Sequence, residues 1–278
     1  MRLRQLRTEI VSRLSAAGDD EASADAAVLI MNALNIDKTH LLLGEDEVGE
    51  SDIKRIYADA ERAAEGEPVQ YITGRCEFMS LEFEVCHGVL IPRADTEVLV
   101  EAALKRLPDR KAVVWDLCCG SGCVGLSVAA YNKNVTVTLA DVSDTALEVS
   151  ARNAQKLGIS RRVRIVKSDV LRDNMSEAAD AVVSNPPYIR RGDIDCLEKK
   201  VRGYEPRLAL DGGEDGLMFY RRIASAAKIK SGGFIAFEIG YDQGRDVEKI
   251  LRHCGYIKTE IIADTEGRSR VVCGMAPY

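Results

Sequence analysis

The sequence lacks the long apolar segments and the metal-ligand spacings that would assign it to a membrane or to a metal site. No run of eighteen apolar residues occurs in its 278 residues, and no basic segment followed by an apolar one stands near its start. We therefore expect a cytoplasmic protein with neither a membrane span nor a signal peptide. The three histidines are scattered and the eight cysteines form no C-x-x-C pair, which predicts reduced thiols and no metal.

An excess of positive charge is also missing. Residues 1–75 contain 9 Lys and Arg against 15 Asp and Glu, which accounts for the whole net charge of -6. This segment would repel a phosphate backbone and the remainder as a whole would not attract one, so we expect no direct nucleic-acid partner. The pairs Arg190–Arg191 and Arg161–Arg162 fit either a local basic patch or a solvated surface.

Two kinds of apolar periodicity divide the chain. Helical spacing in residues 1–75 predicts a small helical domain with helices near 3–14, 24–34 and 51–65, the second capped by Asp19 or Asp20. Residues 76–94 alternate between apolar and polar side chains, which predicts a linking β-hairpin with its turn at His87-Gly88.

From residue 95 to residue 278, strand patterns alternate with helix patterns, which is typical of an α/β domain with a doubly wound parallel sheet. The seven expected strands cover residues 112–117, 135–141, 163–167, 181–184, 233–239, 256–263 and 270–274. The last connection, residues 264–269, is too short for a crossover helix, so we expect the final two strands to be antiparallel.

The strand expected at 181–184 is followed at once by Asn185, Pro186, Pro187 and Tyr188. The two prolines end the strand because neither can donate a ladder hydrogen bond, and ligands bind at this edge of an open α/β sheet. Carbonyl acceptors, the Asn185 amide and the Tyr188 ring suit a planar –NH2 group. The alternative is a plain Pro-Pro turn with Asn185 as a local cap.

A glycine-containing turn follows the strand at 112–117. Residues 120–125 spell G-x-G-x-x-G, a pattern shared by nicotinamide dehydrogenases, methyltransferases and chance turns. Asp141 ends the next strand, where its carboxylate could accept hydrogen bonds from ribose hydroxyls or cap the following helix. Asp116 is placed to orient the loop around an amino-acid moiety, and an N-P-P-Y corner has no role in hydride transfer. These two features favour methyl transfer.

Together these residues resemble S-adenosylmethionine-dependent methyltransferases that act on exocyclic or amide –NH2 groups, whose motif is [D/N/S]-P-P-Y. Further segments resemble the HemK/PrmC family, the release factor glutamine methyltransferases, and follow that family's order. These segments are 68–74, 77–78, 90–97, 141–143, 185–189, 205–206 with 209–210, 215–217 and 238–240. The resemblance covers about residues 66–275, and the helical module fits it too. The chain departs from the family at Cys118, where glycine is usual.

The resemblance implies a Rossmann-like class I methyltransferase fold with a seven-stranded sheet, and substrate recognition by the helical domain. It implies S-adenosyl-L-methionine as cofactor, held by Cys118, Cys119, Gly120, Ser121 and Gly122 at its methionine part, Asp141 at the ribose, Asp169 and Val170 at the adenine, and Asn185. The implied partner is a class 1 peptide chain release factor, whose Gly-Gly-Gln glutamine would lie against Asn185, Pro186, Pro187 and Tyr188. Asn185, Pro186 and Tyr188 are the implied catalytic residues, whereas Arg93, Thr96 and Glu97 would shape the pocket floor.

Alternatives within this class are a glutamine methyltransferase of a ribosomal protein and a nucleic-acid amino methyltransferase with the same corner. A nicotinamide oxidoreductase or a noncatalytic nucleotide-binding module is the alternative from another class, and titration against S-adenosylmethionine and NAD separates them. The sequence does not fix the oligomeric state, for which we favour a monomer. The thiols of Cys118, Cys119 and Cys123 are expected to pack rather than react.

Overall fold

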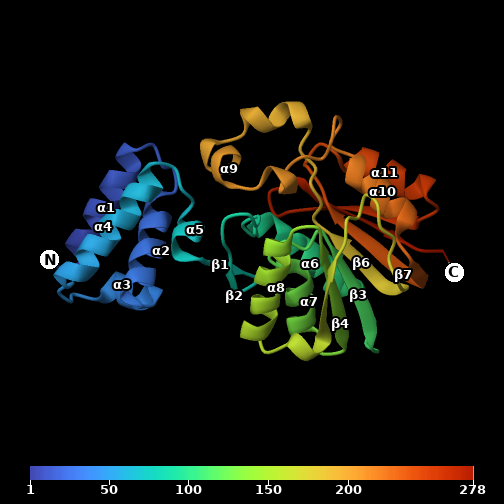
Figure 1. Cartoon of the computed structure of the whole chain (residues 1–278), viewed down its shortest axis with the longest axis horizontal. Helices are drawn as coiled ribbons and strands as arrows, with labels where there is room; N and C mark the ends of the chain where they lie inside the picture. The colour runs from blue at the N-terminus through green and yellow to red at the C-terminus, as the bar shows by residue number, and fades with distance from the viewer. Residues whose placement is uncertain (278) are drawn as a thin grey trace. The chain divides into compact units, whose positions relative to one another are not determined.

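The computed structural model describes residues 1–277, which form two compact units (Figure 1). The first unit combines Met1–Arg75 with Glu198–Tyr204, and the second combines Cys76–Leu197 with Glu205–Tyr278. The chain therefore passes between the units three times. The sequence did not predict that residues 198–204 join the helical unit, because their partners lie more than a hundred residues away in the chain.

The helical unit is built from amphipathic helices. They are α1 (Leu3–Ala16), α2 (Ala22–Leu34), α3 (Lys38–Leu43), α4 (Glu50–Ala64), α5 (Val69–Thr73) and α9 (Lys199–Tyr204). Leu3, Leu6, Ile10 and Leu14 of α1 are buried at a spacing of three to four residues, which puts them on one helix face. They share one core with residues of α2 and α4, and the three predicted helices are confirmed.

The prediction that Asp19 or Asp20 caps the second helix is wrong. Glu21 holds the N-cap position of α2 and makes no side-chain cap, whereas Asp19 accepts a hydrogen bond from the Glu21 N–H at 3.2 Å. The Asp19 carboxylate also pairs with Lys200 Nζ at 2.8 Å, and Asp25 pairs with the same ammonium at 3.2 Å. A buried carboxylate needs a partner of opposite charge. Here that partner, Lys200, lies in a segment that the sequence pattern assigned to the domain of residues 95–278.

The β-hairpin exists, but its predicted turn is wrong. Strand β1 (Arg75–Phe78) pairs with β2 (Leu81–Glu84). The two residues Met79 and Ser80 connect the strands, with φ angles of 52° and 55°. Two positive φ values in a two-residue connection are usually marked by Asn-Gly, so Met-Ser gave no signal. The turn at His87-Gly88 is present but does not connect paired strands.

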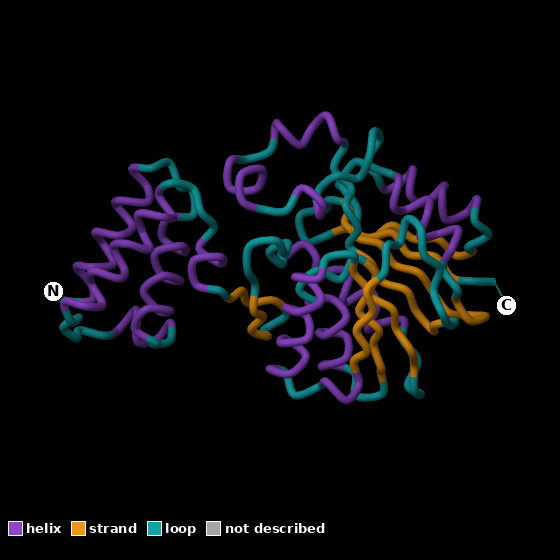
Figure 2. The backbone as a smooth tube through the Cα atoms, in the orientation of Figure 1, coloured by secondary structure: helices purple, strands orange, loops and turns teal. Residues whose placement is uncertain are grey.

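The second unit contains a seven-stranded sheet, and all seven predicted strands are confirmed (Figure 2). The strands are β3 (Ala112–Leu117), β4 (Val135–Asp141), β5 (Val163–Lys167), β6 (Ala179–Ser184), β7 (Ile229–Glu238), β8 (Ile257–Ala263) and β9 (Ser269–Met275). Their order is β5-β4-β3-β6-β7-β9-β8, parallel from β5 to β7, with β9 antiparallel to both of its neighbours. The expected antiparallel final pair is therefore confirmed.

Helices cover both faces of this sheet, as expected for a doubly wound fold. One apolar core joins the strands to α6 (Glu97–Arg106), α7 (Cys123–Tyr131) and α8 (Asp144–Lys156), and the other joins them to α10 (Met218–Ala226) and α11 (Gly244–His253). Short 3₁₀ turns complete the unit at η1 (Ala94–Thr96), η2 (Ser160–Arg162), η3 (Arg191–Cys196) and η4 (Arg207–Ala209).

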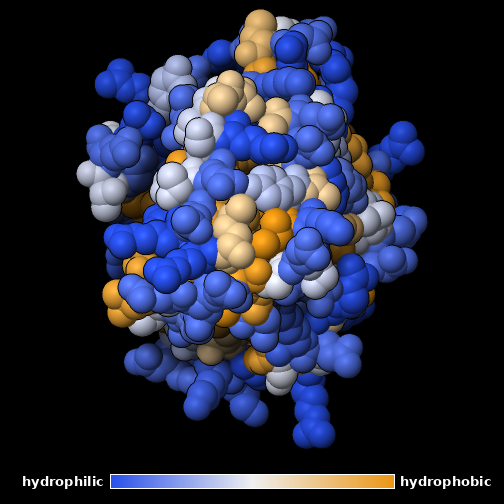
Figure 3. Space-filling view, turned by 90° about the vertical axis from the view of Figure 1, so that its left-hand side faces the viewer, coloured by the Kyte–Doolittle hydropathy of each residue, from blue (hydrophilic) through white to orange (hydrophobic). Residues whose placement is uncertain are grey.

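Few large hydrophobic side chains are exposed on residues 1–277. Figure 3 shows one face of the molecule as mainly hydrophilic, with hydrophobic side chains between the polar ones. The large hydrophobic side chains exposed among residues 1–277 are Met1, Leu42, Leu43, Tyr131, Val142, Leu208, Tyr241 and Ile257. In this part of the chain, no helix has both the length and the apolar content needed to cross a membrane.

Candidate active site

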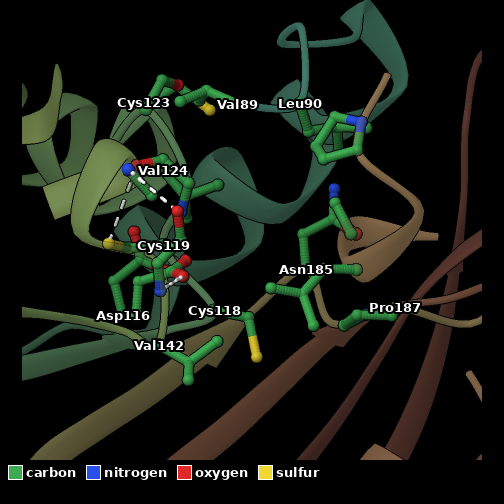
Figure 4. A pocket seen from close by; sticks show the side chains of 18 of the residues that line it. Val89, Leu90, Asp116, Cys118, Cys119, Cys123, Val124, Val142, Asn185 and Pro187 are labelled. Carbon is green, nitrogen blue, oxygen red and sulfur yellow. Dashed lines mark hydrogen bonds between the residues drawn. The ribbon is translucent and has the colours of Figure 1, made fainter. Parts of the chain in front are cut away.

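A pocket lies at the carboxyl edge of the sheet, where β3 and β6 are neighbours (Figure 4). The chain proceeds from β3 outward to β5 and then returns to the other side of β3 at β6. The loops after β3 and β6 therefore diverge, which leaves a crevice at the point where open α/β sheets bind ligands. Residues after β3, β4, β5 and β6 all line the pocket, together with segment 88–93 and with Pro206, Leu208 and Ala209.

The loop after β3 brings backbone to the pocket wall. Gly120 has φ of 54°, and a Cβ built there meets nothing within 4 Å, so its backbone is open on that side. Gly122 points into the packing instead, because a Cβ there would stand 3.0 Å from Leu126 and 3.1 Å from Leu139. Cys118 has φ of 59°, the left-handed region in which glycine is free of strain, which explains why glycine is usual at this position.

Asp116 ties this loop to the helix that follows. It is 1% exposed, and its Oδ2 accepts a hydrogen bond from the Gly125 N–H at 2.8 Å. Burial raises its pKa to about 7, partly opposed by the Gly125 hydrogen bond. A Cβ at Gly125 would lie 2.6 Å from Leu139, so only glycine lets α7 approach the sheet this closely.

Asp141 also holds the loop rather than capping α8. Its Oδ2 accepts from the Gly120 N–H and its Oδ1 from the Ser143 N–H, each at 2.9 Å. Ser143 is the N-cap of α8, with its hydroxyl accepting from the Ala146 N–H at 3.3 Å. Burial raises the pKa of Asp141, while its backbone hydrogen bonds lower it. The helix-cap alternative is wrong, and the carboxylate lines the pocket.

The residues after β5 line the same pocket. Asp169 Oδ1 accepts from the Leu171 N–H at 3.0 Å, and its Oδ2 pairs with Arg172 Nε at 3.4 Å. Val170 and Leu171 contribute apolar surface, as do Val142 after β4 and Phe219 on α10. This combination of a carboxylate with apolar side chains suits a flat ring that carries an amino group.

The N-P-P-Y corner is only partly turned towards the cavity. Asn185 and Pro187 line the pocket, and Figure 4 shows them across it from Cys118 and Cys119. Within residues 1–277, the lining does not include Pro186, Tyr188 or Gly122. Pro186 is buried.

Two hydrogen bonds to neighbouring side chains hold Asn185 and Tyr188 of the corner in place. Asn185 Nδ2 donates to Thr96 Oγ1 at 3.3 Å, and the Tyr188 hydroxyl donates to Glu238 Oε1 at 3.5 Å. Burial raises the pKa of Tyr188 well above its usual value, and the Glu238 charge adds to this effect. Tyr188 is therefore a neutral phenol.

Glycines allow a second segment to pack on this corner. A Cβ at Gly212 would stand 2.7 Å from the Tyr188 Cα, and one at Gly216 would stand 2.4 Å from the Tyr188 carbonyl oxygen. Gln243 Nε2 donates to that same carbonyl at 3.0 Å. The D-G-L segment at 215–217 thus supports the corner, a role that its sequence alone did not reveal.

Several pocket residues were not predicted as site residues. These are Gly88, Val89, Leu90, Ile91, Pro92, Ser143, Ala146, Ser168, Leu171, Pro206, Leu208, Ala209 and Phe219, with Val142 and Val124. Most are apolar and give no chemical signal. Residues 90–92, 206 and 209 belong to segments that resemble family motifs. Their membership in those motifs was the only sequence signal that could have marked them as pocket residues.

The three cysteines near the loop are thiols. Burial raises the pKa of Cys118, Cys119 and Cys123 above the usual value for cysteine, and nearby carboxylates such as Asp116 raise it further. A protonated thiol is a weak nucleophile, which fits packing rather than reaction. Within residues 1–277 no cluster of His, Cys, Asp and Glu is arranged to hold a metal ion.

The chain is similar to known proteins in its sequence and in its fold. Residues 5–74 match the PrmC N-terminal domain and residues 94–212 match the methyltransferase small domain. The chain is 41% identical over 278 residues to the release factor glutamine methyltransferase of Clostridium acetobutylicum, covering 98% of each protein. It is 42% identical over 275 residues to that of Moorella thermoacetica, covering 97% of each. A methyltransferase structure from Pyrococcus furiosus, 17% identical, matches 72% of this chain and 91% of its own with a TM-score of 0.54, which supports the fold.

Proposed function

This chain belongs to the release factor glutamine methyltransferase family, and we propose that it methylates the glutamine side-chain amide in the Gly-Gly-Gln motif of class 1 peptide chain release factors. The observation that carries the proposal is one pocket that joins the cofactor-type loop, residues 118–121, and Asp141 to Asn185 and Pro187. A methyl donor and an amide can be held side by side there, as in-line transfer requires. Such a substrate would place the enzyme in the cytoplasm.

Three features of the pocket support S-adenosylmethionine as its ligand. The backbone at Gly120 is open on one side and would admit the methionine part of the cofactor. Each oxygen of Asp141 already accepts one backbone N–H and keeps a lone pair for a ribose hydroxyl. Asp169 and Val170, with Val142, would hold the adenine by its amino group and its flat face.

The bound cofactor supplies an electrophilic sulfonium methyl, so the protein's task is to position a weak nucleophile. An amide nitrogen has its lone pair delocalised into the carbonyl group. Asn185 Oδ1 and the Pro186 carbonyl would accept the two amide hydrogens, aim the nitrogen and stabilise the positive charge that develops on it. Tyr188 supports this corner through its hydrogen bond to Glu238.

The direct test is methyl transfer from radiolabelled S-adenosylmethionine to a purified class 1 release factor. We expect about one methyl group per release factor molecule, since a single side chain enters the corner. Tandem mass spectrometry should place that methyl on the amide nitrogen of the Gly-Gly-Gln glutamine. Strong labelling of a ribosomal protein or of nucleic acid, with none of the release factor, would contradict the proposed substrate and leave the cofactor assignment standing.

Asp141→Ala should weaken S-adenosylmethionine binding about 10- to 100-fold, because a charged acceptor for the ribose is lost. Isothermal titration calorimetry measures this affinity. The matched control is Asp144→Ala, three residues along the chain, where the carboxylate is exposed and pairs with Lys167. Its cofactor affinity should stay within about twofold of the wild type. An unchanged affinity in folded Asp141→Ala would rule out the ribose contact.

A further inference from the structure

We propose that Leu208, on the segment 205–212, is a specificity-determining residue that packs against the glutamine-bearing loop of the release factor. This inference rests on the proposed function, in which that loop carries its glutamine side chain to Asn185. The segment 205–212 contributes to the pocket wall and is attached at both ends to parts of the chain that hold Asn185. Leu208 lies between these two attachments, and its side chain is largely in solvent.

The first attachment is the ion pair between Arg93 and Glu205. Arg93 Nη2 donates to Glu205 Oε1, and the Glu205 side chain is only 2% exposed. Such a pair is costly to break, because the buried carboxylate would lose its partner where water cannot replace it. Arg93 precedes η1, whose last residue, Thr96, accepts the hydrogen bond from Asn185 at 3.3 Å. This end of the segment is therefore tied to a stretch of chain that also holds the Asn185 side chain.

The second attachment is a short parallel bridge to the residue that follows the N-P-P-Y corner. The Ile189 N–H donates to the Leu210 carbonyl at 3.0 Å, and the Gly212 N–H donates to the Ile189 carbonyl at 2.8 Å. Since Ile189 directly follows Tyr188, this end of the segment is bonded to the corner itself.

These attachments put the segment on the side of the pocket that contains Asn185. Figure 4 shows Leu90, from the same stretch as Arg93, on the side of Asn185 and across the pocket from Cys119. Cys119 belongs to the loop that would hold the methionine part of the cofactor. The ligand expected to meet Leu208 is therefore the acceptor substrate.

The conformation between the attachments determines which side chains face the pocket. The 3₁₀ turn η4 is closed by hydrogen bonds from the Ala209 N–H to the Pro206 carbonyl at 2.9 Å and from the Leu210 N–H to the Arg207 carbonyl at 3.0 Å. Pro206, Leu208 and Ala209 line the pocket, while Leu210 is buried. Leu208 remains 58% exposed. A leucine held by such a turn at the edge of a cavity loses its contact with water when a ligand covers it.

The chemistry of a Gly-Gly-Gln loop matches this apolar side chain. Two methylene groups separate the glutamine amide from the backbone, and they offer apolar surface to Leu208. The glycines carry no side chain, so the backbone of the loop can approach Leu208 closely. Single exposed leucines are common on protein surfaces. What distinguishes Leu208 is that it lines the pocket on a segment bonded to the corner.

The first test compares Leu208→Ala with Leu208→Met. Alanine removes the apolar contact, so KM for the release factor should rise roughly 5- to 20-fold. The kcat at saturating release factor and the cofactor affinity should stay within about threefold, since the contact is equally present in the ground state and the transition state. Methionine keeps the apolar bulk and should hold KM within about twofold of the wild type.

The matched control for this test is Ile257→Ala, which removes an exposed apolar side chain on β8 outside the pocket lining. Its KM should equal that of the wild type. Because Leu208 is exposed, its variants should keep the wild-type melting temperature, which excludes unfolding as the cause of a raised KM. An unchanged KM in Leu208→Ala would overturn the proposal.

The second test measures which ligand covers residue 208. In Leu208→Cys, alkylation of the new thiol by iodoacetamide is followed by mass spectrometry of the peptide that contains it. The release factor together with S-adenosylhomocysteine should slow this alkylation at least about tenfold, whereas S-adenosylhomocysteine alone should change it less than about twofold, because a thiol reacts only where reagent can reach it. Cys254, which is exposed and outside the pocket lining, is the internal control in the same sample.

The outcomes separate this inference from the proposed function. Protection by S-adenosylhomocysteine alone would assign Leu208 to the cofactor and overturn the proposal. A release factor that is methylated but gives no protection would overturn it as well, while leaving the proposed function standing. Absence of methylation by the wild type would instead contradict the proposed function, and the occupant assigned to Leu208 would fall with it.

Discussion

Replacing Asn185 with alanine should reduce methyl transfer at least about 100-fold while leaving S-adenosylmethionine affinity within about threefold of the wild type. The side chain supplies an acceptor for the reacting amide at the mouth of the corner, and no other side chain of the N-P-P-Y motif except Pro187 lines the pocket. Proline has no side-chain acceptor to take over the role. The loss should therefore appear in kcat and not in cofactor binding.

The measurement is single-turnover methylation of the release factor, with cofactor affinity determined separately by calorimetry. Asn134→Ala is the matched control, because Asn134 is exposed and its amide bonds the Asp109 carbonyl far from the pocket lining. It should methylate at the wild-type rate. A folded Asn185→Ala protein with near-normal turnover would show that the corner does not position the amide.

The sheet was predictable from the sequence because its strands are marked by local signals. Apolar runs in the sequence predicted the positions of the parallel strands. Their ends, and so the carboxyl edge of the sheet, are marked by Asp141, by the glycine loop after Leu117 and by the two prolines after Ser184. The pocket at that edge then follows from topology. The alternation of strands and helices and the family motifs pointed to the same fold.

Contacts between distant segments could not be predicted in the same way. Thr96 and Asn185 stand 89 positions apart, and the motifs that contain them do not show that the Asn185 amide donates to the Thr96 hydroxyl. Lys200 reaches Asp19 and Asp25 from a segment that follows the N-P-P-Y corner in the chain. Such contacts depend on the three-dimensional fold, and they produce no periodic pattern in the sequence.

The turn of the β-hairpin could not be predicted for a different reason. Met79 and Ser80 adopt positive φ without the glycine or asparagine that usually announces such a turn. Glu97 holds this turn in place, since its Oε1 accepts from the Met79 N–H at 2.6 Å. A long-range contact therefore overrides the local preference, and the sequence motif that contains Glu97 gave no sign of its partner.

Changing the glutamine of the release factor's Gly-Gly-Gln motif to asparagine should abolish labelling, although the amide group itself is kept. Asparagine is one methylene shorter, so its nitrogen would stop more than about 1 Å short of Asn185, and a displacement of this size can cost a hundredfold in rate. Replacement by glutamate should also abolish labelling, because a carboxylate has no hydrogens for the Asn185 oxygen to accept. A glutamine changed elsewhere in the same release factor is the matched control.

DNA and RNA should not be labelled under the same conditions. Residues 1–75 carry the whole negative net charge of the chain, so they would repel a polyanion and are better suited to a folded protein with complementary charge. The glycines beside the target glutamine let that loop extend its side chain into a narrow corner, which a glutamine within a helix cannot do. If the asparagine variant were labelled as well as the native release factor, the methylated amide would have to lie elsewhere in the release factor. The distance between the side-chain amide and Asn185 would then not be what selects the substrate.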